Sequence, residues 1–156
     1  MPVFLIRHAK AGSRSRWDGE DFDRPLTSAG LEQSQLLVET LSKHLPPAIY
    51  SSPFLRCIQT VEPIAKHCGL TVNIVSQLAE GANFEETIAL LNAVEENSVL
   101  CSHGDVIPNA VQALIRRGLK MTTPTDSRKA GIYILHRDRS QFVSAECLSP
   151  PKVLTS

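Results

Sequence analysis

The hydrophobic and polar positions of this chain fall into blocks that predict strands and helices in turn. The first apolar run, Pro2 to Ile6, has the length and composition of a short buried strand. Comparable short runs predict further strands over residues 48–51, 71–75, 98–102, 130–136 and 142–148. A charged turn at 137–140 predicts that the last two form an antiparallel pair. Strands that alternate with helices are typical of a three-layer α/β/α fold with a mainly parallel central sheet.

Between the strands, apolar residues recur at helical spacing. The predicted helices cover about 28–44, 53–68, 84–96 and 105–117. Thr27 or Ser28 is the expected N-cap of the first helix, and Ser52 is the expected N-cap of the second. Pro63 removes a backbone donor inside the second helix, so we expect a kink or break near 59–62.

A polar loop from Lys10 to about Pro25 separates the first strand from the first helix. It contains three arginines, one tryptophan and several acids. A loop of this length in a compact domain is usually functional or disordered. With 156 residues and no internal repeat, the chain predicts a single domain over 1–149, followed by a frayed tail at 150–156.

Composition and charge exclude several classes of protein. The chain is 42% hydrophobic and 21% charged, and its formal net charge is +0. The chain has no overall excess of basic residues, so we expect it to bind neither a nucleic acid polymer nor an anionic membrane. We also expect no signal peptide and no membrane span. The four cysteines lack CxxC and zinc-ligand spacing, so we expect reduced thiols, no metal, no cofactor and a cytoplasmic location.

Candidate chemistry gathers where three predicted strands end. Arg7 and His8 follow the first strand, and Arg56 lies one helical turn beyond the second. His103 follows the strand over 98–102. In a parallel sheet these ends share one edge, which is where α/β proteins bind ligands. Arginines grip phosphate with forked donors, and an unprotonated histidine can attack phosphorus in line, so the pattern indicates phosphoryl chemistry.

Two accessory groups would complete such a site. The nucleophilic histidine needs a carbonyl to fix its tautomer, and Gly12 in the adjacent loop is a candidate to supply it. The leaving group needs an acid, and Glu80, just beyond the third strand, is the best-placed carboxyl. The alternative for Glu80 is an ordinary loop carboxylate.

The early loop offers candidate substrate contacts. Lys10, Arg14 and Arg16 are candidates to bind further phosphates or a phosphoprotein surface, and the alternative is a solvated charged loop. Trp17 is a candidate to stack on a base or cover the pocket, but packing of the loop against the core is the favoured interpretation. Ser52 is either a helix cap or a phosphate ligand.

Four segments together resemble the histidine phosphatase superfamily, the phosphoglycerate-mutase-like group. They are LIRHAK at 5–10, RPLTSAG at 24–30, SSPFLRCIQT at 51–60 and SHG at 102–104. They occur in the order of the family's motifs and span about two thirds of the chain. The resemblance implies a phosphoglycerate-mutase-like fold.

The resemblance also implies roles for individual residues. His8 would form a covalent phosphohistidine, and Arg7, Arg56 and His103 would bind the phosphate without a metal. Glu80 matches the position of the family's usual proton donor, although the small SixA-type branch often lacks that acid. Ala9 stands where the mutases have glycine, as is common in the SixA-type branch. The early loop is also similar to that of phosphatase domains fused to Nudix hydrolases.

The sequence therefore predicts a metal-independent phosphoric monoester hydrolase. The resemblance to the SixA-type branch favours a protein phosphohistidine phosphatase. A phosphatase of a small phosphate ester or nucleotide is the alternative within enzymes. The alternative of another class is a non-catalytic module that recognises phosphate. A free nucleophilic histidine at position 8 argues against such a module, because a pure binder does not need one.

Overall fold

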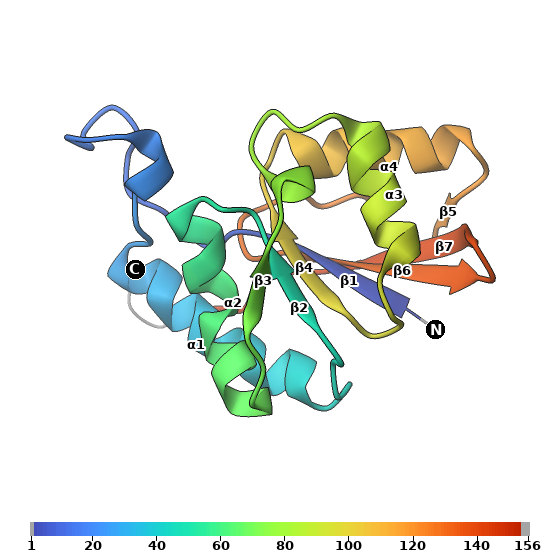
Figure 1. Cartoon of the computed structure of the whole chain (residues 1–156), viewed down its shortest axis with the longest axis horizontal. Coiled ribbons are helices and arrows are strands. Elements are labelled where there is room, and N and C mark those ends of the chain that lie inside the picture. Colours follow the sequence, from blue (N-terminus) through green and yellow to red (C-terminus); the bar gives the residue numbers. More distant parts are fainter. Residues whose placement is uncertain (1, 154–156) are drawn as a thin grey trace.

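The computed structural model describes residues 2–153 and contains one seven-stranded sheet with helices on both faces (Figure 1). The strands are β1 (Pro2–Arg7), β2 (Ile49–Ser51), β3 (Val72–Ile74), β4 (Val99–Ser102), β5 (Lys120–Met121), β6 (Ile132–Asp138) and β7 (Gln141–Leu148). The helices are α1 (Ser28–Ser42), α2 (Leu55–Cys68), α3 (Phe84–Ala93) and α4 (Val106–Arg116), with short 3-10 helices at Asp21–Asp23 and Ser76–Leu78.

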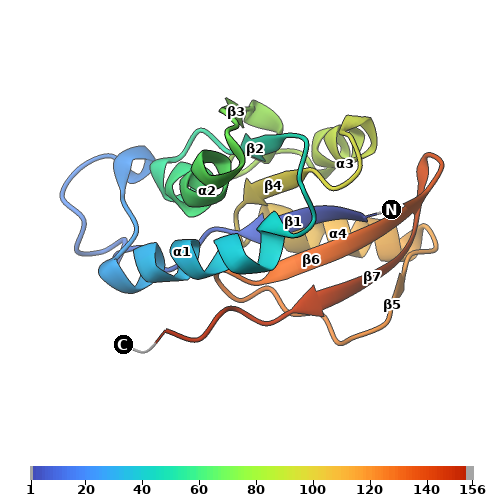
Figure 2. The ribbon, with the colours of Figure 1, turned by 90° about the horizontal axis from the view of Figure 1, so that it is seen from below.

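The order of strands across the sheet is β3-β2-β4-β1-β6-β7-β5. Strands β3, β2, β4 and β1 are parallel, and β6 pairs antiparallel with both β1 and β7. Helices α1 and α2 cover one face, and α3 and α4 cover the other (Figure 2). The predicted three-layer α/β/α fold with a mainly parallel sheet is confirmed.

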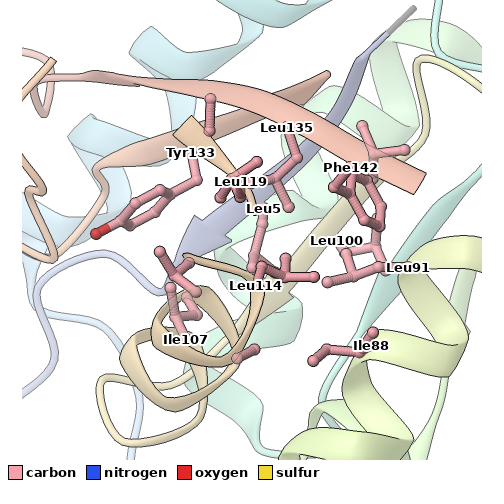
Figure 3. Close-up of a cluster of buried hydrophobic side chains, with 14 of the residues drawn as sticks. Leu5, Ile88, Leu91, Leu100, Ile107, Leu114, Leu119, Tyr133, Leu135 and Phe142 are labelled. Carbon is pink, nitrogen blue, oxygen red and sulfur yellow. The ribbon is translucent and has the colours of Figure 1, made fainter. Parts of the chain in front are cut away.

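Two hydrophobic cores lie on opposite faces of the sheet because successive strand residues point in opposite directions. From β1, Val3 and Leu5 enter the core beneath α3 and α4, where they meet Ile88 and Ile107 (Figure 3). Phe4 and Ile6 enter the core beneath α1 and α2. Burial on both faces explains why β1 reads as an uninterrupted apolar run instead of an alternating one.

Several predicted element ends shift for reasons visible only in three dimensions. Thr27 is the N-cap of α1, as one of the two expected residues, and accepts from the Gly30 amide. Helix α2 begins at Leu55, so Ser52 is not its N-cap. Helix α3 ends at Ala93 instead of about 96, because the guanidinium of Arg137 on β6 caps its last carbonyls.

Pro63 lies inside α2, which continues unbroken from Leu55 to Cys68. Of the predicted kink or break near 59–62, the break is therefore wrong. The loss of one hydrogen bond is offset by a buried helix face that includes Val61 and Ile64. Strand β5 was not predicted, because two residues that pair in parallel with β7 leave no periodic signal.

The early loop is ordered by contacts at both of its ends. Ala11 and Leu26 form an antiparallel bridge, and the Thr27 amide donates to the Lys10 carbonyl at 3.0 Å. The loop extends outward at the left of Figure 1 and carries the 3-10 helix Asp21–Asp23.

Other predictions concern the termini, the thiols and the membrane. The four cysteines are free, as expected. Within residues 2–153 no helix is long and apolar enough to cross a bilayer. Of the predicted tail, residues 154–156 lie outside the described part of the chain.

Candidate active site

The carboxyl ends of β1, β2 and β4 meet at one edge of the sheet. Arg7 of β1 lies opposite Ser102 of β4, and Ser51 of β2 lies opposite Cys101 of β4. This register brings the segments that follow the strands around a cavity of about 340 Å³. The predicted residues that line it are Arg7, His8, Arg14, Arg56, Glu80 and His103.

His8 is buried, and its Nδ1–H donates to the backbone carbonyl of Ala9 at 2.8 Å. Because Nδ1 carries the proton in this contact, Nε2 keeps the free lone pair. The predicted carbonyl of Gly12 does not fill this role, because it accepts from the guanidinium of Arg24 instead.

Burial lowers the pKa of His8 to about 3. The hydrogen bond to Ala9 raises this pKa, but it is outweighed by burial together with the charges of His103, Arg56 and Arg7. At neutral pH the imidazole is therefore uncharged, which is the protonation state that attack on phosphorus requires.

Arg7 is fixed by its contacts on two sides. Its Nη1 donates to the Ser127 carbonyl at 2.8 Å, and its buried Nε has no hydrogen-bond partner in the described part of the chain. Gly104 lies against the guanidinium, so closely that a Cβ there would sit 2.6 Å from Arg7 Cζ. Glycine at 104 therefore leaves the space that the guanidinium occupies.

Arg56 is almost fully buried and is held by Asp21, a residue that sequence reasoning missed. Nη1 donates to the Asp21 carbonyl at 3.0 Å, and Nη2 donates to its carboxylate at 3.2 Å. Its Nε is buried without a partner in residues 2–153. Both arginines thus keep one buried donor without a partner in the described residues, which is costly unless a ligand or water satisfies it.

His103 lies beside these groups, with its ring centroid 5.5 Å from that of His8. Its Nε2 is 2.8 Å from the Ser52 hydroxyl, and Arg56 Nη2 is 3.5 Å from its Nδ1. Because a guanidinium only donates, this arrangement favours a proton on Nε2 that is donated to Ser52. Donation from Nδ1 to a phosphoryl oxygen would require the doubly protonated ring. Ser52 orients His103, a role that neither sequence interpretation of this serine included.

Glu80 reaches the cavity, as predicted. Its carboxylate accepts from Arg14 Nη2 at 2.8 Å and from Arg56 Nη2 at 3.4 Å. Of the three cations predicted to contact substrate from the early loop, Arg14 lines the cavity, whereas Lys10 and Arg16 do not.

Trp17 neither lines the cavity nor packs into the core, so the favoured interpretation of this residue was wrong. Its side chain is 39% exposed, and the indole N–H donates to the Glu20 carbonyl. The loop turns back on itself, and the indole covers Gly19 instead of the sheet.

Sequence reasoning also missed residues that come from several loops. Asp105 follows the SHG motif directly and lines the cavity, a signal that was available. Lys129 lines it from the loop before β6 without any motif. Burial lowers the pKa of Lys129, and the charges of Arg7 and Arg24 add to this effect. No group of three or more His, Cys, Asp or Glu within residues 2–153 is arranged to hold a metal ion.

A neutral histidine that shares a cavity with one buried and one partly buried arginine, at the carboxyl edge of a sheet, defines an α/β protein with an anion-binding site. Residues 3–87 match the model of the histidine phosphatase superfamily (branch 1). The chain therefore belongs to this superfamily.

Known relatives agree with this assignment. The 8-oxo-(d)GTP phosphatase of Mycolicibacterium smegmatis is 32% identical over 155 residues, which cover 96% of this chain and 48% of that protein. The chain thus spans about half the length of this relative.

Solved structures support the fold. The putative phosphohistidine phosphatase SixA from Agrobacterium tumefaciens superposes with a TM-score of 0.74 at 23% identity, covering 96% of this chain and 97% of that chain. The protein histidine phosphatase SixA complexed with tungstate gives 0.71 at 23% identity, covering 93% and 96%.

Proposed function

We propose that this chain is a phosphatase that forms a covalent phosphohistidine at His8 and acts on phosphohistidine in a protein. The observation that carries the proposal is the state of His8, which is uncharged, bonded through Nδ1 to Ala9, and free at Nε2. Arg7 and Arg56 each keep a buried donor for the phosphoryl oxygens.

The first step transfers the phosphoryl group to the enzyme. The Nε2–P bond forms on His8 while the bond from phosphorus to the leaving group breaks. Glu80 acts here in its protonated form and gives its proton to the leaving atom; the hydrolysis step restores that proton. The contact between Glu80 and Arg56 keeps this carboxyl beside the phosphoryl site.

The second step hydrolyses the phosphohistidine. A water oxygen bonds to phosphorus, the Nε2–P bond breaks, and Glu80 takes the proton of the attacking water. Inorganic phosphate is released, and the starting enzyme is regenerated. Arg7 and Arg56 supply the positive charge, and His103 adds to it when its ring is doubly protonated. Turnover is therefore expected to persist in EDTA, and a strict metal requirement would contradict this mechanism.

The likeness of the fold to SixA structures supports the phosphohistidine substrate, since those proteins are described as phosphohistidine phosphatases. A second candidate is a nucleotide or another small phosphate ester. It is supported by the relative described as an 8-oxo-(d)GTP phosphatase and by the cations Arg14 and Lys129 at the cavity. A non-catalytic module is disfavoured, because a binder gains nothing from an uncharged His8.

A competition between substrates decides between the two enzyme candidates. The purified chain is given a phosphohistidine-bearing phosphotransfer domain, a nucleoside triphosphate, a nucleoside diphosphate and a sugar phosphate, and kcat/KM is measured for each. The proposal predicts the highest value for the phosphohistidine protein. A nucleotide preferred by tenfold or more would replace that substrate while leaving the phosphohistidine mechanism intact.

A further inference from the structure

The turn that carries Glu80 is held in place from the neighbouring helix. The amide of Gly81 donates to the carboxylate of Asp105 at 2.9 Å. Gly81 and Asp105 are 24 residues apart in the sequence, and both Glu80 and Asp105 line the cavity. The backbone next to the candidate acid is therefore fixed by a charged acceptor on another element.

The local geometry explains why this contact matters. The Ala82 amide donates to the Ala79 carbonyl at 3.0 Å, which closes a four-residue turn with Glu80 and Gly81 at its centre. Gly81 has φ of +79°, the value that the third position of a type II turn requires. The central amide of such a turn points outward and needs an acceptor, or its peptide plane can rotate.

Asp105 is free to serve as this acceptor. It immediately precedes α4, yet its side chain makes no hydrogen bond to the first turn of that helix. The other charged groups that act on Asp105 are Arg7 and Arg14. Neither makes an ion pair with it within residues 2–153, so the Gly81 amide is its defined partner there.

We propose that Asp105 is a positioning residue for Glu80. By fixing the Glu80–Gly81 peptide, it keeps the Glu80 carboxyl at the phosphoryl site between Arg14 and Arg56. The proposal rests on the assignment of Glu80 as the acid in the proposed function. It predicts that Asp105 acts through an accepted hydrogen bond and not through its charge.

Two variants separate the hydrogen bond from the charge. D105A removes the acceptor, whereas D105N keeps an oxygen that accepts from Gly81. With phenyl phosphate, whose leaving group needs protonation, D105A is expected to lower kcat about tenfold, a part of what general acid catalysis contributes. D105N should regain most of the loss. With 2,4-dinitrophenyl phosphate, which needs no acid, D105A should keep nearly the wild-type kcat/KM, because kcat/KM reports the phosphorylation step and not the later hydrolysis, in which Glu80 acts as base.

A cycle with E80Q tests whether Asp105 acts through Glu80. In the E80Q background D105A should cause no further loss of kcat on phenyl phosphate. An added loss there, equal losses in D105A and D105N, or equal losses of kcat/KM on the two substrates would overturn the proposal. D138N is the matched control, because Asp138 lies at the opposite edge of the sheet. It should behave as wild type.

The Gly81 amide gives a readout independent of turnover. In a 15N-labelled protein its proton resonance should move upfield and exchange faster in D105A than in the wild type, with D105N between them. An unchanged Gly81 signal in D105A would overturn the proposal even if D105A were poorly active through loss of stability.

The proposed function fails in a different way. An E80Q enzyme with full activity on phenyl phosphate would remove Glu80 as the acid, and the role of Asp105 with it. Labelling of His8 by phosphate would then still support the covalent mechanism. Absence of that label would contradict the covalent mechanism, whatever the activity of D105A.

Discussion

Gly104 lies in contact with the guanidinium of Arg7, and a Cβ at 104 would meet Arg7 Cζ, Nη2 and Nε at 2.6, 2.7 and 2.8 Å. Arg7 would have to move to make room for a methyl group. The obstructed atoms form the far end of a flexible side chain, so movement is less costly than a clash with backbone. The glycine of the SHG motif therefore protects the position of a phosphate ligand more than the stability of the fold.

Gly104→Ala is accordingly predicted to lower kcat/KM about 10²-fold, the order expected when a catalytic group is displaced by about 1 Å. The free energy of unfolding should fall by less than about 1 kcal/mol, because no buried apolar surface is lost. Steady-state kinetics and urea unfolding measure the two quantities.

Arg7→Ala supplies the comparison for Gly104→Ala. The double variant should be no slower than Arg7→Ala alone, because both changes act on one guanidinium. Additive losses would show that Gly104 acts on another part of the site.

Asp21→Ala should destabilise the protein in a way that inorganic phosphate reverses. The variant removes the carboxylate from buried Arg56, at a cost of about 1–2 kcal/mol for a charged hydrogen bond lost at a partly exposed position. Phosphate that binds Arg56 replaces the missing charge and stabilises only the folded state.

Thermal unfolding with and without phosphate measures this effect. The rise in Tm caused by phosphate should be larger in Asp21→Ala than in the wild type. Asp138→Asn serves as the control for charge removal and should respond to phosphate as the wild type does. An equal rise in Tm for all three proteins would contradict the role of Asp21 at Arg56.

The low pKa of His8 predicts a loss of stability in acid. The unfolded imidazole binds a proton near its ordinary pKa of 6.5, whereas the folded one stays neutral down to about 3. Between these values the unfolded state holds more protons, so stability decreases as pH falls through that window, by up to about 5 kcal/mol. Urea unfolding at pH 7 and at pH 4.5 measures the decrease.

His8→Gln is the matched variant, because it cannot gain a charge. Its stability should fall less steeply than that of the wild type between pH 7 and pH 4.5. Parallel curves for the two proteins would mean that His8 is not held neutral by burial.

The sequence was most informative where function depends on residues next to strand ends. Arg7 and His8 directly follow the first apolar run, and parallel pairing then places Arg56 and His103 beside them. The fold class followed from alternating strand and helix patterns, which record burial directly. Motif order supplied the family.

Other features depend on contacts between distant segments. The acceptor for His8 is Ala9 and not Gly12, because the path of the loop decides which carbonyl is near. The clamp of Arg56 by Asp21 joins residues 35 positions apart and leaves no periodic trace. Helix α3 ends where Arg137, on strand β6, donates to the Val94 carbonyl. Local patterns do not encode such contacts.

The proposed mechanism requires a covalent phosphohistidine at His8, and trapping this intermediate is its most direct test. The enzyme is mixed with 32P-labelled phosphodonor, quenched in alkali within one turnover, and digested for peptide mapping. The account predicts one labelled peptide containing His8, stable in alkali and lost in acid, and no label in His8→Ala, which should also be inactive. Label on another residue, or substantial turnover by His8→Ala, would contradict it.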